Sequence, residues 1–205
     1  MRREMRAVLE DVGHAYPGGN NLFRGLTVTL EPDRVYGLVG PSGSGKSTLL
    51  AVLAGWLRPT QGTVRLTGIA TVKWVLQNPH GVPRRTALDH VALSFLARGA
   101  SRKQAERRAS EVLADFGIGA LADRLYRDLS GGEAQRLGLA RAIACDPELC
   151  LVDEPTAQLD QRSAAQVSRS LRVLADRGAI VVVATHDPGA RAACTDVIDL
   201  MDYQT

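Results

Sequence analysis

The chain has 205 residues, of which 45% are hydrophobic, and a formal net charge of +3. This length suits one well-buried α/β domain, and the modest charge argues against a dedicated nucleic-acid binder, which carries a denser basic face. No apolar run approaches the roughly 20 residues that span a bilayer, and the basic start lacks the apolar core of a signal peptide, so we expect a cytoplasmic protein. The three cysteines have no C-x-x-C spacing, which predicts reduced interior thiols.

Short strands dominate the predicted structure of the N-terminal part. Residues 7–36 alternate apolar and polar side chains around a Pro-Gly-Gly-Asn turn, which is typical of antiparallel strands. The apolar residues 35–39 predict a further strand, followed by a helix that is expected to run to about Leu57, just before a proline. Residues 63–66 and 69–76 predict two more strands.

Helical periodicity replaces this pattern over residues 78–130. Apolar positions repeat at helical spacing in 88–96 and 101–116, and Ser101 with Gln104 predicts a capping box at the start of the second helix. The stretch 78–130 therefore predicts an inserted α-helical subdomain.

The C-terminal part alternates helices with strands that are apolar throughout. Residues 149–152 and 180–184 are such strands, and helices are expected over 133–145 and around Val167 to Leu174. Apolar strands separated by helices indicate a mainly parallel sheet. We predict one α/β domain over residues 1–205, with a mainly parallel sheet, an N-terminal antiparallel β-subdomain and the inserted helical subdomain.

A glycine-rich loop follows the strand at 35–39 and matches G-x-x-x-x-G-K-[ST]. Its glycines let backbone N–H groups turn toward an anion, and the helix N-terminus adds positive potential. Lys46 can reach the β- and γ-phosphates of a nucleoside triphosphate, and Ser47 can ligate Mg²⁺. The sequence therefore predicts a P-loop NTPase core that binds the phosphates through Gly40, Pro41, Ser42, Gly43, Ser44, Gly45, Lys46, Ser47 and Thr48.

Two acidic residues, Asp153 and Glu154, directly follow the apolar strand at 149–152. Ligands gather at the carboxyl ends of parallel strands, so these carboxylates are expected beside the phosphate loop. Asp153 can hold Mg²⁺ through water, and Glu154 can orient and deprotonate the water that attacks the γ-phosphate. The alternative is a pair of helix N-cap acids ahead of Pro155.

A second short motif, Leu-Ser-Gly-Gly-Glu-Ala-Gln-Arg, occupies residues 129–136 and opens a predicted helix. A serine and two glycines at a helix N-terminus can bind an anion, because the free N–H groups and the helix dipole both favour negative charge. Taken alone, the pattern also fits an ordinary N-cap. The other motifs decide its interpretation.

Over essentially its whole length, the chain resembles the nucleotide-binding domains of the ATP-binding-cassette (ABC) family. Residues 129–135 match the family's signature sequence, and Gln77 fits its glutamine after a strand. Residues 157–160 match its D-loop, His186 its switch histidine, and Tyr16 its adenine-stacking aromatic. These motifs occur in the order that the family has them.

The resemblance implies a shared site between two domains that bind head to tail. Ser130, Gly131, Gly132 and Glu133 of one subunit would then meet the γ-phosphate of the ATP held by Lys46 of the other. Each site would be incomplete in a single chain, so the cofactors ATP and Mg²⁺ would be enclosed only in the dimer.

The resemblance also implies roles for single residues. Glu154 would be the general base, Asp153 and Gln77 would contact Mg²⁺ together with the loop serine, and His186 would sense the γ-phosphate. Asp160 would couple the two sites across the dimer interface.

By this resemblance, the expected function is ATP hydrolysis by the motor subunit of an ABC transporter. A homodimer, or a heterodimer with another ABC ATPase subunit, would drive integral membrane permease subunits from the inner face of the cell membrane, without nucleic acid. Residues 86–91 and 185–188 are similar to the exporter branch, whereas 16–19 and 78–79 equally resemble uptake ATPases of the energy-coupling-factor type. A soluble ABC ATPase of the iron–sulfur assembly type is a further alternative.

Two departures from the family pattern are expected to leave the catalytic positions intact. The D-loop begins with Ala157-Gln158 where the family often has Ser-Ala, but Asp160 is kept. The interval from Lys46 to Gln77 is shorter than usual, and we expect the missing segment between residues 68 and 71.

Overall fold

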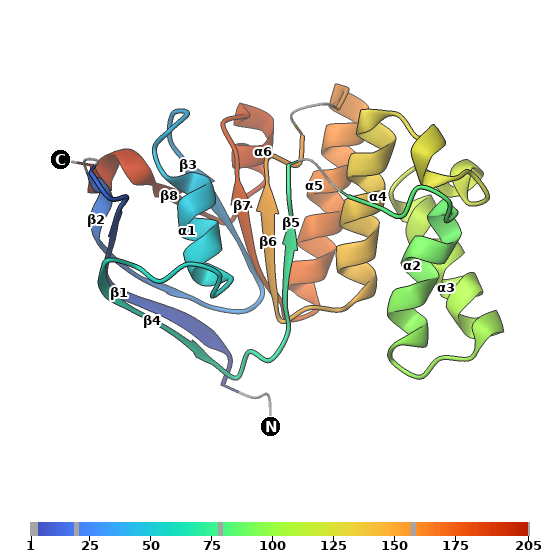
Figure 1. Cartoon of the computed structure of the whole chain (residues 1–205), viewed down its shortest axis with the longest axis horizontal. Helices are drawn as coiled ribbons and strands as arrows, with labels where there is room; N and C mark the ends of the chain where they lie inside the picture. Colours follow the sequence, from blue (N-terminus) through green and yellow to red (C-terminus); the bar gives the residue numbers. More distant parts are fainter. Residues whose placement is uncertain (1–3, 19–20, 78–79, 157–158, 205) are drawn as a thin grey trace.

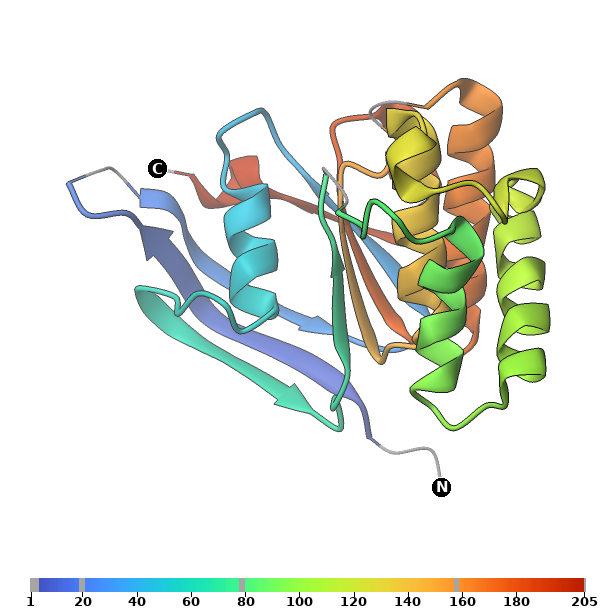
Figure 2. The same ribbon diagram turned by 45° about the vertical axis from the view of Figure 1, so that its right-hand side comes forward.

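The computed structural model describes residues 4–18, 21–77, 80–156 and 159–204. In this part of the chain, a three-stranded and a five-stranded sheet lie on either side of one helix, and further helices cover the outer face of the larger sheet (Figures 1 and 2). The predicted α/β fold is confirmed.

The smaller sheet is antiparallel and has the strand order β2-β1-β4. Its strands are β1 (Arg6–Ala15), β2 (Asn21–Leu30) and β4 (Gln61–Thr67), in agreement with the predicted antiparallel strands. Its inner face carries Leu9, Val12 and Leu26, which are buried against α1 (Lys46–Leu53).

The larger sheet is parallel in all its pairs and has the order β5-β6-β7-β3-β8. Its strands are β3 (Arg34–Val39), β5 (Val72–Val75), β6 (Leu149–Asp153), β7 (Ile180–Ala184) and β8 (Asp196–Asp199). Every residue of the central strands β6 and β7 is buried, which explains why all of them except Asp153, at the end of β6, are apolar.

Alternate residues of these central strands serve two separate cores. Leu149 and Leu151 pack toward α1, whereas Cys150 and Val152 pack toward α4 (Gly131–Ala144) and α5 (Gln161–Asp176). The remaining elements are α2 (Ala87–Leu96), α3 (Arg102–Asp115), α6 (Pro188–Ala192), η1 (Gly119–Leu121), η2 (Tyr126–Asp128) and η3 (Leu200–Tyr203). All three cysteines are free thiols.

The predicted end of the first helix is wrong. α1 ends at Leu53 rather than near Leu57, because Gly55 takes a left-handed φ of 72°. The N–H of Gly55 then donates to Val52 O and that of Trp56 to Ala51 O, the two bonds of a Schellman motif. This glycine was the signal in the sequence that marks the end of the helix.

The predicted strand at 69–76 is also too long, since β5 begins only at Val72. The side chain of Glu148 accepts hydrogen bonds from the backbone N–H groups of Ala70 (2.5 Å) and Thr71 (2.8 Å). A carboxylate thus holds the chain at the point where the shortened interval was expected, and these two N–H groups take no part in a sheet ladder.

The helices predicted within 78–130 form as α2 and α3, and the Ser101–Gln104 capping box is present. Both helices contact α4 and lie at the opposite end of the molecule from the antiparallel sheet (Figure 1). The division of the chain into one domain with an inserted subdomain stays a prediction. In the described ranges, no helix combines the length and the apolar character that crossing a membrane requires.

Candidate functional site

A cavity of about 630 Å³ lies where β3 and β6 end. Residues far apart in the sequence, from Tyr16 to His186, contribute to it, which explains why only the folded protein brings the predicted residues together. Its lining consists of Tyr16, Leu22, Ser42, Gly43, Gly45, Lys46, Ser47, Thr48, Gln77, Asp153, Glu154 and His186. Of these residues, only Leu22 is absent from the sequence-based prediction.

The loop between β3 and α1 has the backbone of a phosphate cradle. Gly40, Gly43 and Gly45 have φ values of 143°, 81° and 97°, which side chains rarely allow. A Cβ atom on Gly45, the N-cap of α1, would lie 2.9 Å from the ring of Phe23. Glycine is therefore required for both conformation and space, and the first turn of α1 stays open toward the cavity.

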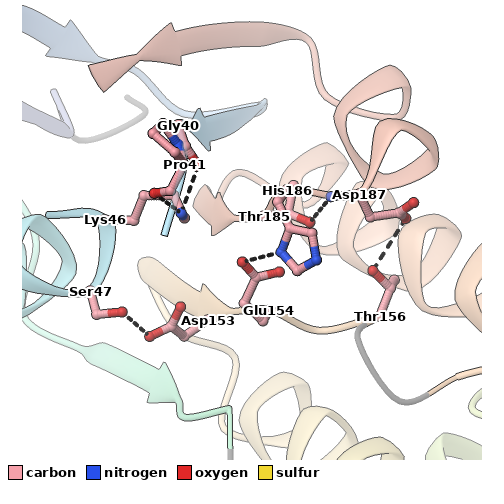
Figure 3. Close-up of polar contacts among 10 residues, drawn as sticks. All are labelled: Gly40, Pro41, Lys46, Ser47, Asp153, Glu154, Thr156, Thr185, His186 and Asp187. Carbon is pink, nitrogen blue, oxygen red and sulfur yellow. Dashed lines mark hydrogen bonds and ion pairs between the residues drawn. The ribbon is translucent and has the colours of Figure 1, made fainter. Parts of the chain in front are cut away.

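Lys46 folds back over this loop. Its Nζ donates to Gly40 O at 2.8 Å and to Pro41 O at 3.0 Å, and the residue is only 9% exposed (Figure 3). Within the described residues, the buried Oγ of Ser44 has no hydrogen-bond partner. The loop thus holds one cation and one unused hydroxyl, both suited to phosphate oxygens.

The hydroxyl of Ser47 donates to Asp153 Oδ2 at 2.7 Å (Figure 3). Asp153 is 8% exposed, and its burial raises the pKa of the carboxyl group, with a smaller contribution from the charge of Glu154. A buried carboxylate beside a hydroxyl is an oxygen donor set that Mg²⁺ prefers, and a cation would offset the cost of the buried charge. These residues therefore fit the predicted metal.

Glu154 follows directly and points toward His186. Its Oε1 lies 2.8 Å from His186 Nδ1, while its Oε2 is buried and has no partner in the part of the chain that the structure describes. The side chain of His186 is 70% exposed, so the pair reaches from the protein interior to the cavity. Glu154 also has a left-handed φ of 48°, an unfavourable conformation for a residue with a side chain.

A hydrogen-bonded layer that the sequence analysis missed lies behind this pair. Thr156 Oγ1 donates to Asp187 Oδ2 at 3.3 Å, and the N–H of Asp187 donates to the fully buried Thr185 Oγ1 at 3.0 Å (Figure 3). Asp187 also caps α6 by accepting from its first N–H groups. The chain neighbours of Glu154 and His186 are thereby joined to each other.

Tyr16 stands at the rim of the cavity. Its hydroxyl lies 3.3 Å from Thr48 Oγ1, its ring meets His14 edge to face at 4.9 Å between centroids, and it is 50% exposed. An exposed ring face beside the phosphate loop is suited to stacking on a planar base.

The motif at 129–136 lies at the N-terminus of α4, outside this cavity. Ser130 is the N-cap of α4 and forms a capping box with Glu133, whose carboxylate accepts from the Ser130 N–H at 2.7 Å. This bond lowers the pKa of Glu133, and the nearby Arg124 and Arg136 add to the effect. None of Ser130, Gly131, Gly132 and Glu133 lines the cavity described above.

Asp160 is likewise outside the cavity and caps α5. Its Oδ1 accepts from the N–H of Ser163 at 2.9 Å and its Oδ2 from the hydroxyl of Ser163 at 2.8 Å. These bonds lower the pKa of Asp160. The first two D-loop positions, Ala157 and Gln158, lie outside the described residues.

A parallel sheet with a glycine loop at the end of β3 and a carboxylate pair at the end of β6, in the same sheet, defines a P-loop nucleotide-binding domain. The family model described as ABC transporter matches residues 23–157. The chain belongs to this family and is an ATP-binding ATPase domain of it.

Two proteins that are similar in sequence to this chain are also ATP-binding proteins of transport systems. An ABC transporter ATP-binding protein of Mycobacterium tuberculosis, itself uncharacterised, is 38% identical over 96% of this chain, and the chain spans 65% of that relative's length. A lipoprotein-releasing system ATP-binding protein of Caulobacter vibrioides is 37% identical, with 95% of this chain and 92% of the relative covered.

Among solved structures, the ATP-binding cassette MJ0796, a dimer in a post-hydrolysis state with ADP and Pi, is 28% identical. The match covers 94% of this chain and 93% of the cassette, with a TM-score of 0.81. An ATP-binding subunit of another ABC transporter shares the fold at 22% identity, covering 94% of this chain and 85% of that subunit, with a TM-score of 0.81.

Proposed function

We propose that this chain is the ATP-hydrolysing motor of a membrane transporter and that it works as a head-to-tail dimer. The observation that carries the proposal is the position of the α4 N-terminus. Ser130 and Gly131 are exposed and lie outside the cavity that holds Lys46 and Glu154. A second chain, related to the first by a two-fold axis, could place this anion-binding terminus against the phosphates in the first chain's cavity.

In the proposed reaction, Tyr16 stacks on the adenine and the loop N–H groups with Lys46 hold the phosphates. Ser47, Asp153 and Gln77 would hold Mg²⁺, which supplies positive charge to the phosphate oxygens. The Oε2 of Glu154 accepts a proton from the attacking water, whose oxygen displaces ADP from the γ-phosphorus.

His186 has two tasks in this proposal. Its Nδ1 holds Oε1 of Glu154 at 2.8 Å, which leaves Oε2, buried and without a partner among the described residues, as the oxygen assigned to the water. Its exposed ring edge would contact the γ-phosphate. The loss of that phosphate would then change the position of His186 and, through it, of the Glu154 carboxylate.

The dimer could contain two copies of this chain or one copy and a related ATPase subunit. Support comes from the dimeric state of the MJ0796 cassette. Asp160 would lie at the interface and connect the two sites, while Ser130, Gly131, Gly132 and Glu133 would complete the partner's site.

For the direction of transport, we favour export. The lipoprotein-releasing relatives support this choice together with the residues at 86–91 and 185–188. Integral membrane permease subunits would bind the ATPase dimer at the inner face of the membrane. The alternatives are an uptake ATPase of the energy-coupling-factor type, supported by residues 16–19 and 78–79, and a soluble ABC ATPase of iron–sulfur assembly.

Light scattering of the Glu154→Gln variant with and without ATP tests the shared site. We expect ATP to convert the monomer to a dimer, and Ser130→Arg in the same background to abolish this dimer by placing a bulky side chain at the α4 terminus. A variant that binds ATP and stays monomeric would contradict the proposal for the isolated chain.

Pull-down from native membranes tests the transport function. Recovery of a protein with several membrane spans is expected, and its sequence would separate export from uptake. A protein that stays in the soluble fraction without such a partner would favour the soluble ATPase instead.

A further inference from the structure

A chain of side-chain contacts connects the N-terminus of α4 with the N-terminus of α5. The guanidinium Nη1 of Arg136 donates to Ser163 Oγ at 3.0 Å, and the same Oγ donates to Asp160 Oδ2 at 2.8 Å. Arg136 also lies one turn after Glu133 on α4 and adds to the positive potential at that carboxylate. Neither Arg136 nor Ser163 has a role in the proposed reaction.

The chemistry of these groups fixes the direction of every hydrogen bond. A guanidinium can only donate and a carboxylate can only accept, so the hydroxyl of Ser163 must accept from Arg136 and donate to Asp160. Bonds that share one hydroxyl in this way polarise and strengthen one another.

No other hydrogen bond among the described residues replaces the one from Arg136 to Ser163 at the Nε of this guanidinium. The Nε of Arg136 is buried without a hydrogen-bond partner among the described residues, so loss of the Ser163 hydroxyl would leave a second donor of this guanidinium unsatisfied. Asp160 would keep the N–H of Ser163, so the α5 cap itself would survive.

We infer that Ser163 is a positioning residue that, together with Arg136, couples the anion-binding end of α4 to Asp160 within one chain. The inference rests on the proposed function, because both helix ends would face the second subunit. While the hydrogen bonds from Arg136 to Ser163 and from Ser163 to Asp160 are both present, α4 and Asp160 move as one unit. Contact of the α4 N-terminus with the partner's phosphate therefore sets the position of Asp160.

Dimerisation of the Glu154→Gln protein measures this coupling. We expect Ser163→Ala to weaken ATP-driven dimerisation about tenfold, the effect of losing a hydrogen bond to charged groups, while ATP affinity of the monomer is unchanged. Ser163→Thr, which keeps the hydroxyl, should restore the parent behaviour. Ser170→Ala is the matched control, since that α5 hydroxyl donates to Gln166 O of its own helix.

Equal dimerisation of Ser163→Ala and its parent would overturn the inference. A parent that does not dimerise would instead contradict the proposed function, and hydrogen–deuterium exchange of the nucleotide-free monomer then decides the inference alone. Ser163→Ala should speed exchange over residues 129–136 of the neighbouring helix, and Ser170→Ala should not. Faster exchange confined to α5, or an equal loss of protection throughout the chain, would show that the serine is merely structural.

Discussion

Ser47 and Asp153 are 106 positions apart in the sequence, yet the hydroxyl of one donates to the carboxylate of the other at 2.7 Å. The first belongs to the opening turn of α1 and the second ends β6, so the packing of α1 on the parallel sheet brings these oxygens together. The sheet thereby places a buried negative charge beside the phosphate loop. Several properties of that charge can be measured.

Asp153→Asn should weaken Mg²⁺ binding at least tenfold, because the amide removes the charge but keeps the shape. ATP binding without metal should be retained. Titration of ATP hydrolysis with Mg²⁺ measures the effect. Asp199→Asn serves as the control, since Asp199 lies outside the cavity and accepts from the N–H of Met201. An unchanged Mg²⁺ requirement in Asp153→Asn would contradict the assignment of this carboxylate.

The same substitution should change how stability depends on pH. Burial raises the pKa of Asp153 above its ordinary value of 3.8, so its favourable contribution to folding is present below that value and is lost as the pH rises through the folded-state pKa. Without metal and nucleotide, Asp153→Asn should therefore be more stable than the native chain near neutral pH, and the difference should vanish in acid. Urea unfolding at about pH 3 and about pH 7 gives the two free energies. A difference that grows in acid would refute this assignment.

Glu154→Gln should lower kcat for ATP hydrolysis by about 10²- to 10⁴-fold, since the amide cannot take up the proton of the attacking water. The amide oxygen can still accept from His186, so the site geometry and ATP affinity should persist. Steady-state hydrolysis and ATP-binding titrations separate the two effects. Near-native turnover would remove Glu154 from its proposed role.

Gly45→Ala should destabilise the fold by about 1–3 kcal/mol and also abolish tight ATP binding. Its φ of 97° is unfavourable for alanine, and the new methyl group would press against Phe23. Gly99→Ala is a matched control, because Gly99 has a φ of 85° but no atom within 4 Å of the added Cβ. That variant should lose about 1 kcal/mol of stability and keep its ATP affinity. Both quantities come from thermal unfolding and nucleotide titration.

The parts of the site that the sequence predicts are those with short, local patterns. The glycine loop needs positive φ values, and the apolar strand before Asp153 needs burial, so each motif carries its own physical reason. Their meeting in one cavity follows from the parallel sheet, whose strand ends share an edge.

Other features depend on contacts between distant segments and could not be predicted in the same way. The Glu148 side chain that holds Thr71 lies 77 positions further along the chain, and only the fold shows that it shortens β5. The bond from Thr156 to Asp187 similarly joins two loops that have no common sequence pattern. Gly55 is different, because a glycine after an apolar helix is a local stop signal that outweighs the later proline.

The contact between Thr156 and Asp187 yields the last prediction. It joins Thr156, two residues after Glu154, to Asp187, directly after His186, so its loss should loosen the geometry of that pair without touching the phosphate cradle. Thr156→Val keeps the size of the side chain and removes only the hydroxyl. We expect kcat to fall about tenfold, for a lost hydrogen bond with a charged acceptor, while KM for ATP stays constant.

Two further variants make this test specific. Thr156→Ser restores the hydroxyl and should recover kcat. Thr195→Val removes a hydroxyl that bridges the backbone N–H and C=O of Val35, neither of which lines the cavity, and should lower thermal stability rather than kcat. If Thr156→Val hydrolyses ATP at the native rate, the hydrogen bond to Asp187 stabilises the loops and has no influence on how Glu154 and His186 are aligned.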